Sequence, residues 1–123
     1  MYIITMSQRN PPQEQIDYVL NLFKSNQIQQ ALDFIDTLSK DYPDESLLFN
    51  IRGACYAGLG QLDIAVQSYE KALSIKPDYA KAHYNLGGAL QELDKLHDSA
   101  KSYENAIALE PENAQAHNNL AIV

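Results

Sequence analysis

The feature that most constrains the fold of this chain is a period of 34 residues. Pro43, Pro77 and Pro111 follow one another at that interval. The string SYEKALSIKPDYAKAH, which begins at Ser68, aligns without a gap with SYENAIALEPENAQAH, which begins at Ser102. A fixed period of about 20 to 50 residues indicates that one small structural unit is repeated along the chain. The period therefore predicts an array of stacked units.

Each period contains two segments with helical spacing. Phe49, Gly53 and Tyr56 fall at positions i, i+4 and i+7, which share one face of a helix. The glycines of the segment 58–60 then predict a break, because glycine weakens helices and permits turns. The proline near the end of the unit predicts a second break, since the residue before proline avoids the helical region. No strand-like alternation extends over a useful length, so we predict an all-α fold.

The residues of this pattern resemble the signature of the tetratricopeptide repeat family. Those that carry the resemblance are Phe49, Gly53, Tyr56, Ala65, Tyr69, Ala72 and Pro77 in one unit, and His83, Leu86, Gly87, Leu90, Tyr103, Ala106 and Pro111 in the next. The resemblance implies an all-α, right-handed superhelical array of antiparallel helix pairs. It implies about three repeats and a partial fourth.

The alignment of the units predicts where each repeat begins and ends. Val19 stands where the later units have glycine, which makes the first repeat divergent. Arg52 takes the place of a leucine, and Ser99 that of an alanine. The predicted segments are an N-terminal tail at 1–11, a divergent repeat at 12–45, repeats at 46–79 and 80–113, and the first helix of a truncated fourth repeat at 114–123.

Composition excludes several classes of partner. The net charge is −7, whereas a nucleic-acid-binding protein needs a basic surface to neutralise phosphates, so we exclude nucleic acid. No apolar run approaches the roughly 20 residues that a membrane-spanning helix requires, so we expect no membrane insertion. The single cysteine, Cys55, has no second cysteine for an internal disulfide, which fits a cytoplasmic location.

In the family that the chain resembles, the first helix of each unit lines a concave groove that holds a peptide or a partner's helix. Carrying those positions over gives a predicted peptide-binding groove formed by Asn50, Lys81, Tyr84, Asn85, Gln91, Gln115, Asn118 and Asn119. The alternative is that these side chains are only solvated surface. The four asparagines could form a ladder that grips a peptide backbone, because an amide offers donors and an acceptor. They resemble the asparagine ladder in the repeat arm of protein O-linked sugar transferases.

This ladder is incomplete, because Asp17 and Ile51 occupy the matching places in the first two units. Two readings remain open for the apolar residues nearby, namely Ile16, Leu20, Phe23 and Ile51. They could form an apolar end of the groove, or they could complete the packing of the divergent first unit. Some members of the family clamp a carboxylate with inward lysines and arginines. Here Ile16, Leu20 and Ile51 occupy such places, so we expect no clamp of that kind.

We predict that the chain is not an enzyme and binds no cofactor or metal. His83 and His117 lie one full period apart, beyond the roughly 2 Å bond that each metal ligand needs. Both occupy a bulky position of the signature, so we assign them to packing. Cys55 has no basic neighbour in the sequence to lower its pKa, and we interpret it as a structural thiol.

Three hypotheses for function follow. The leading one is a protein-interaction scaffold that binds a peptide or partner helix in the groove. The second is a substrate-recruiting N-terminal arm of a larger enzyme, similar to a glycosyltransferase or sulfotransferase, whose catalytic domain lies beyond residue 123. The third is a self-assembly module. Because the sequence stops within a predicted helix, we expect a fragment of a longer protein and self-association through residues 114–123.

Overall fold

A computed structural model of the chain describes residues 10–123. This range contains α-helices and no strand, as the period predicts. Most of the predicted tail at 1–11 lies outside the described residues. The helices are α1 (Gln13–Lys24), α2 (Ile28–Asp41), α3 (Ser46–Gly58), α4 (Leu62–Ile75), α5 (Ala80–Glu92), α6 (Leu96–Leu109) and α7 (Ala114–Ile122).

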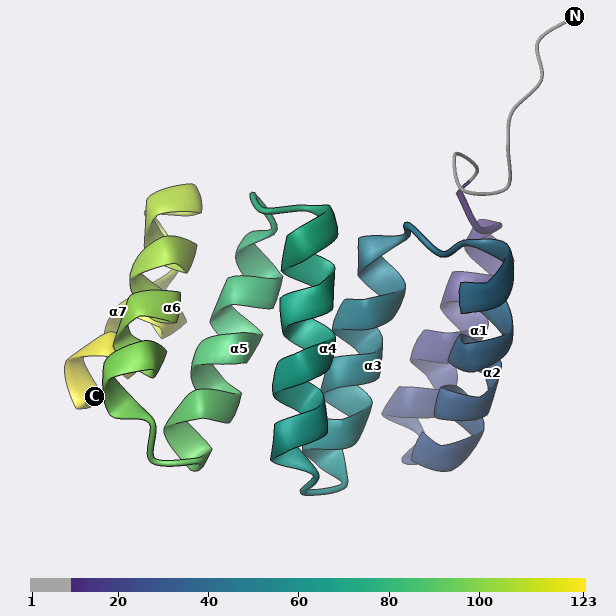
Figure 1. Ribbon diagram of the computed structural model, residues 1–123, viewed down its shortest axis with the longest axis horizontal. Coiled ribbons are helices and arrows are strands. Elements are labelled where there is room, and N and C mark those ends of the chain that lie inside the picture. Colours follow the sequence, from purple (N-terminus) through teal and green to yellow (C-terminus); the bar gives the residue numbers. More distant parts are fainter. Residues whose placement is uncertain (1–9) are drawn as a thin grey trace, which may run out of the picture.

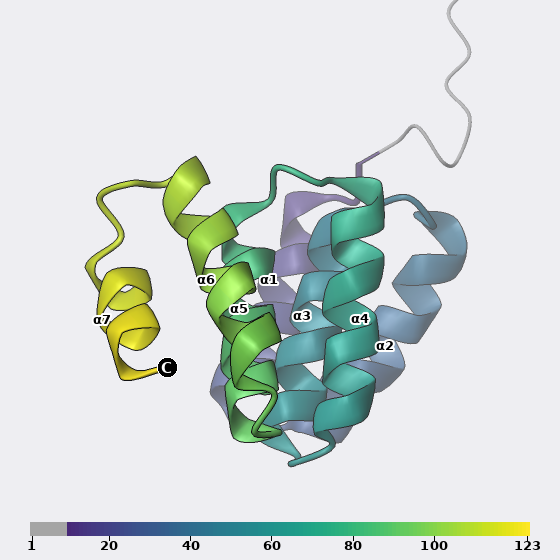
Figure 2. The same cartoon turned by 60° about the vertical axis from the view of Figure 1, so that its left-hand side comes forward.

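The helices form a row of two layers in which each helix packs on its neighbours in sequence (Figures 1 and 2). We call α1, α3, α5 and α7 the inner layer and α2, α4 and α6 the outer layer. Successive helices of the inner layer touch, because α3 contacts α5 and side chains of α5 and α7 are hydrogen-bonded to each other. The row runs from α1 and α2 at one end to α7 at the other (Figure 1).

The turn inside each helix pair contains a residue in the left-handed region. Asn26 has φ 61°, Gly60 has φ 75° and Asp94 has φ 62°, and they stand at equivalent positions of the three units. In the second unit the backbone N–H of Gln61 donates to the carbonyl oxygen of Tyr56 at 2.9 Å. This is the Schellman arrangement, in which a left-handed residue ends a helix and satisfies its last carbonyls. Glycine adopts that conformation without strain, and asparagine and aspartate tolerate it.

Glycine and tyrosine pack against each other where the helices of a pair cross. A Cβ atom at Gly53 of α3 would lie 2.6 Å from Cδ1 of Tyr69 on α4. A Cβ at Gly87 of α5 would lie 2.8 Å from Cδ1 of Tyr103 on α6. Both distances are shorter than side chains allow, so these glycines are required for the ring to reach the helix backbone.

In the first unit, different side chains pack where the two helices of the pair cross. Val19 and Ile35 occupy the positions of the glycine and the tyrosine, and both are 0% exposed in one buried cluster. A larger residue replaces glycine while a smaller one replaces tyrosine, so the two changes in volume partly offset each other. Core substitutions that conserve total volume are tolerated best. The divergence noted in the sequence is therefore a compensated pair of changes.

Two further features complete the description of the array. Ser99, which stands in place of alanine, is fully buried, and its Oγ donates to the carbonyl oxygen of Gly87 at 2.7 Å. The hydroxyl is thus satisfied inside the core, where an unpaired one would be costly. Among the residues that the structure describes, no helix has the length and apolar character that crossing a membrane requires.

Candidate functional site

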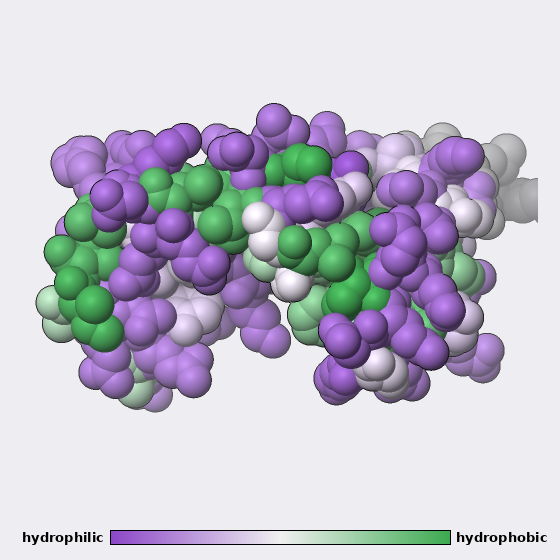
Figure 3. Space-filling model, turned by 90° about the horizontal axis from the view of Figure 1, so that it is seen from below, coloured by the Kyte–Doolittle hydropathy of each residue, from purple (hydrophilic) through white to green (hydrophobic). Residues whose placement is uncertain are grey.

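The inner layer contains the predicted groove residues. Figure 3 shows the molecule hollowed between the end that holds α1 and α2 and the end that holds α7. Asn85 of α5 donates from Nδ2 to Oδ1 of Asn50 of α3 at 3.1 Å. Asn119 of α7 donates from Nδ2 to the hydroxyl of Tyr84 of α5, also at 3.1 Å. These bonds join three successive helices of the inner layer.

The two hydrogen bonds have the same spacing along the sequence. Each connects residues that are 35 positions apart, one more than the repeat period. The equivalent pair at the first junction is Ile16 and Ile51, which lie together in a buried cluster and are each 5% exposed. We call these three pairs the inner ladder: Ile16 with Ile51, Asn50 with Asn85, and Tyr84 with Asn119.

Asn50 is the most constrained of the predicted groove residues. It is 7% exposed, and its Nδ2 donates to the hydroxyl of Tyr79 at 3.3 Å while its Oδ1 accepts from Asn85. Asn50 therefore holds the helices together. Asn85 is half-buried, and its bond to Asn50 uses one amide hydrogen. Among the described residues no donor is bonded to the side-chain oxygen of Asn85, so this acceptor is unused.

Tyr84 and Gln91 both contact Tyr103, a ring that is 1% exposed. The rings of Tyr84 and Tyr103 have centroids 5.8 Å apart, and the Tyr103 hydroxyl donates to Oε1 of Gln91 at 2.9 Å. Burial raises the pKa of Tyr103 above the usual value of a phenol, so its hydroxyl stays protonated and donates at neutral pH. The residue pattern indicates only a packing role for Tyr103.

The structure does not bring Lys81, Gln115 and Asn118 into this bonded network. All three are exposed. Lys81 is the second residue of α5. There it lines a cavity of about 380 Å³ together with Tyr79 and Leu109. Gln115 and Asn118 belong to α7 and are open to solvent. The assignment of all eight residues to a ligand groove stays a prediction.

The apolar residues near the first junction belong to the core. Ile16 and Ile51 are members of the buried cluster, and Leu20 and Phe23 are partly buried and pack against it. Of the two readings left open by the sequence, packing of the first unit is the one that the structure supports. The inner ladder is therefore apolar at its first junction and polar at the next two.

The two repeated histidines have a role that the sequence reading did not identify. Nε2 of His83 lies 2.8 Å from the carbonyl oxygen of Pro77, and Nε2 of His117 lies 2.8 Å from that of Pro111. A carbonyl oxygen only accepts, so Nε2 carries the hydrogen in both rings. Each histidine thus ties a helix to its preceding proline turn. His83 is half-buried and His117 is exposed, so the packing role assigned to His117 from the sequence is wrong. In the described part of the chain, no three His, Cys, Asp or Glu residues cluster as metal ligands.

Comparison with known families and proteins gives consistent matches. Residues 53–94 match the family model described as a TPR repeat, and residues 80–113 match the one described as a tetratricopeptide repeat. The peroxisomal targeting signal receptor of Kluyveromyces lactis is 29% identical over 75 residues, which cover 61% of this chain and 13% of the receptor. The corresponding receptor of Candida albicans is 28% identical over 90 residues, covering 68% of the chain and 15% of the receptor. The chain thus matches only a small part of these relatives.

Solved structures show the same arrangement of helices. The first TPR of Spaghetti (RPAP3), bound to the HSP90 peptide SRMEEVD, superposes with a TM-score of 0.85 at 27% identity, covering 88% of this chain and 86% of that one. The Sgt2 TPR domain from Aspergillus fumigatus gives a TM-score of 0.88 at 20% identity, covering 98% and 82%, and supports the fold. With its repeat period, its paired helices and these matches, the chain belongs to the tetratricopeptide repeat family.

Proposed function

We propose that this chain is a protein-interaction scaffold that holds a peptide or a partner's helix against the inner layer, along α3, α5 and α7. The observation that supports this most directly is the inner ladder. Asn85 and Asn119 are half-buried side chains fixed by hydrogen bonds, so they meet a ligand in a defined orientation. A fixed amide loses little side-chain entropy on binding, which favours affinity.

The chemistry of these groups suits a polypeptide ligand. Each half-buried asparagine has an unused acceptor, and an extended peptide offers a backbone N–H at regular intervals. Gln115 and Asn118 add exposed donors and acceptors on α7. Such contacts to the backbone would grip a peptide with little dependence on its sequence. Tyr84 adds an aromatic surface in the middle of the row.

The structure with the greatest bearing on the ligand is the RPAP3 domain, which was solved with an HSP90 peptide. We propose that this chain shares the general activity of holding a peptide, but not a clamp for a terminal carboxylate. At the first junction Ile16 and Ile51 are buried apolar residues, where such a clamp would need polar groups.

We also propose that the chain has no catalytic activity of its own. Cys55 is fully buried, and burial raises its pKa to about 11 from 9.0. The thiol is then protonated at neutral pH, whereas the thiolate is the nucleophile. The hypothesis of a recruiting arm for a larger enzyme places all chemistry beyond residue 123, and the full reading frame tests it.

The binding proposal is tested with a library of random, phage-displayed dodecapeptides selected on the wild-type chain. The selected peptides are then titrated into the Asn85→Ala, Asn119→Ala double variant. We expect the double variant to bind them at least about tenfold more weakly, because two oriented amides are removed. Asn105→Ala, an exposed asparagine on α6 of the outer layer, is the matched control and should bind as the wild type does.

Circular dichroism confirms that each variant is folded at the assay temperature. If the double variant is folded and binds the selected peptides as tightly as the wild type, the inner layer is not their binding surface and the proposal is wrong.

A second candidate function is self-association through α7, which the exposure of Ile122 favours. Its side chain is 73% exposed, the largest exposure among the large apolar residues described. Burying it against a second copy would remove apolar surface from water. Light scattering at several concentrations should show a mass that rises with concentration in the wild type and stays that of a monomer in Ile122→Glu. A wild type that is monomeric throughout would refute this candidate.

A further inference from the structure

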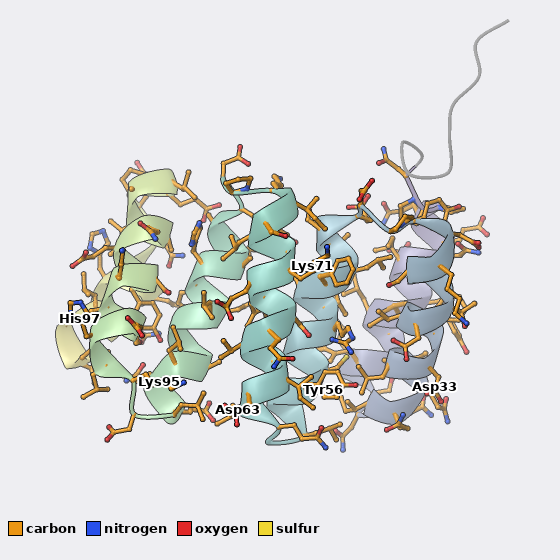
Figure 4. All side chains as sticks on the ribbon, viewed as in Figure 1. Asp33, Tyr56, Asp63, Lys71, Lys95 and His97 are labelled. Carbon is orange, nitrogen blue, oxygen red and sulfur yellow. The ribbon has the colours of Figure 1, made fainter. Side chains whose placement is uncertain are left out.

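A cavity of about 380 Å³ lies on the opposite side of the array from the predicted groove. Its walls are α2 and α4 of the outer layer, and its floor is α3. In Figure 4, Lys71 and Tyr56 both lie in the space between α4 and α2. We call this cavity of about 380 Å³ the outer cavity. The residues that line it are Asp36, Ser39, Phe49, Arg52, Gln67, Ser68 and Lys71.

Arg52 on the floor of the outer cavity is held in place from several sides. Its Nη1 donates to Oγ of Ser68 at 2.8 Å, and its Nε lies 4.0 Å from Oδ1 of Asp36. Its guanidinium lies 4.9 Å from the centroid of the Tyr56 ring. The side chain is 30% exposed, so solvent and ligands reach it. Arginine has five N–H donors, and these contacts leave most of them unused.

Lys71 supplies a second cation, and its Nζ lies 5.8 Å from the centroid of the Phe49 ring. Against these two cations stands one carboxylate, that of Asp36, which is 64% exposed. The lining of the outer cavity therefore carries one net positive charge. This is unusual on a chain whose net charge is −7.

Ser39 provides an unsatisfied hydroxyl in the wall of the same cavity. Its Oγ is buried and has no hydrogen-bond partner among the described residues. A buried hydroxyl without a partner costs free energy, which a polar guest would recover.

The cationic lining does not follow from the repeat itself. An equivalent cavity of about 250 Å³ lies one period later, over α5 between α4 and α6. There the positions of Ser39, Arg52 and Lys71 are taken by uncharged residues. The substitutions, in that order, are Leu73, Leu86 and Asn105. The outer cavity thus has features that packing of the fold does not require.

We propose that the outer cavity binds a carboxylate side chain of an acidic partner polypeptide. Arg52 and Lys71 pair with the carboxylate, and the Phe49 ring contacts its methylene groups. The Ser39 hydroxyl, which is buried in the unbound protein, turns about χ1 toward the cavity and donates a hydrogen bond to the carboxylate. The guanidinium fork matches the geometry of a carboxylate. One net positive charge in the lining balances a carboxylate, whereas a phosphate dianion would be left with excess negative charge. The lining of the outer cavity shares no residue with the inner ladder, so the two surfaces can be tested by separate substitutions.

The test is an NMR titration of the ¹⁵N-labelled chain with a capped penta-glutamate peptide, a capped penta-glutamine peptide and inorganic phosphate. We expect penta-glutamate alone to shift the amide signals of residues 36–39 and 67–71. The affinity should fall as salt is added, since screening weakens exposed ion pairs. The variant Arg52→Leu, Lys71→Asn, which copies the equivalent cavity, should bind at least about tenfold more weakly.

Two further variants separate binding from folding. Lys101→Gln removes a cation from the equivalent cavity and should leave penta-glutamate binding unchanged. Ser39→Ala should weaken binding without lowering the melting temperature, because it removes a hydroxyl that has no partner in the folded chain. The proposal is overturned if penta-glutamate shifts no signals at the outer cavity, if the Arg52→Leu, Lys71→Asn variant binds it equally well, or if phosphate binds as tightly.

Discussion

Asn85 of α5 is bonded to Asn50 of α3 through a 3.1 Å contact between their side-chain amides, and the two residues are 35 positions apart. The acceptor, Oδ1 of Asn50, belongs to a side chain that is 7% exposed. Two consecutive repeats are therefore joined by a hydrogen bond between a buried and a half-buried side chain. Its removal has a consequence for stability that is separate from any effect on binding.

We predict that Asn85→Ala lowers the free energy of unfolding by about 1 to 2 kcal/mol, because Oδ1 of Asn50 loses its donor inside the protein. Urea denaturation followed by circular dichroism measures the change. Asn118→Ala is the matched control, since that side chain is exposed on α7, and it should leave the midpoint unchanged. Equal midpoints for Asn85→Ala and the wild type would show that the bond does not contribute to stability.

Adjacent glycines of α5 should respond differently to the same substitution. A Cβ at Gly87 would lie 2.8 Å from the Tyr103 ring, whereas one at Gly88 would lie 3.7 Å from the Tyr103 hydroxyl. We expect Gly87→Ala to cost about 1 to 3 kcal/mol through overpacking. Gly88→Ala should be neutral or stabilise by up to about 1 kcal/mol, because alanine favours helix. Thermal melts of the two variants provide the comparison.

The double variant Gly87→Val, Tyr103→Ile tests the explanation directly, because it copies the pair Val19 and Ile35 of the first repeat. It should be more stable than Gly87→Val alone. If the second substitution restores no stability, then the volume of the pair is not what the fold requires at this crossing.

A second pair of glycines tests the turn between α3 and α4. Gly60 has φ 75°, a conformation that side chains with a Cβ adopt at a cost, so Gly60→Ala should destabilise by about 1 kcal/mol. Gly58 lies in the last turn of α3 with no atom within 4 Å of a Cβ built there. Gly58→Ala should therefore stabilise by about 0.4 to 1 kcal/mol. If the urea midpoints of both variants shift in the same direction relative to the wild type, this account is wrong.

Stability should decline at alkaline pH. Burial raises the pKa of Cys55 from 9.0 to about 11, and burial also raises that of Tyr69. A raised folded-state pKa means that the unfolded chain releases the proton first as the pH rises. The contribution of Cys55 is thus complete below pH 9.0 and is lost as the pH rises to about 11. Urea midpoints at pH 7, 9 and 10.5 measure the decline.

Cys55→Ala is the control for this pH dependence, and its stability should fall less steeply across the same interval than that of the wild type. The thiol should also react with a disulfide reagent in urea-unfolded protein but not in the folded chain at pH 8. Rapid reaction of the folded chain would contradict the burial of Cys55.

The sequence predicted most of the fold because the fold is periodic. The prolines indicated the period, and the glycines of the segment 58–60 and the prolines indicated where helices end. The residue pattern does not mark Asn26 and Asp94 as turn residues, because glycine is the stronger sequence signal for a left-handed turn. The histidines were assigned to packing, since their bonds to proline carbonyls depend on a loop geometry that the residue pattern does not contain.

The candidate site was predicted only in part, for a geometric reason. The 34-residue period aligns Asn85 with Asn119, but side chains of successive inner helices meet at a separation of 35 residues. Asn50 therefore reaches Asn85, and Asn119 reaches Tyr84 rather than another asparagine. The outer cavity was missed because Arg52 and Lys71 lie on different helices, and only their packing around α3 brings them to one surface.

The inner ladder also determines the order of the repeats. Each junction pairs different side chains: isoleucine with isoleucine, asparagine with asparagine, and tyrosine with asparagine. If the second and third repeats were exchanged, Asn85 would take the place of Ile51 and face the buried side chain of Ile16. Ile16 would lose its apolar neighbour, and Asn85 would lose its hydrogen bond to Asn50. The repeats share one backbone plan, yet they are not interchangeable modules, and any shuffled version of this chain would have to redesign its junctions.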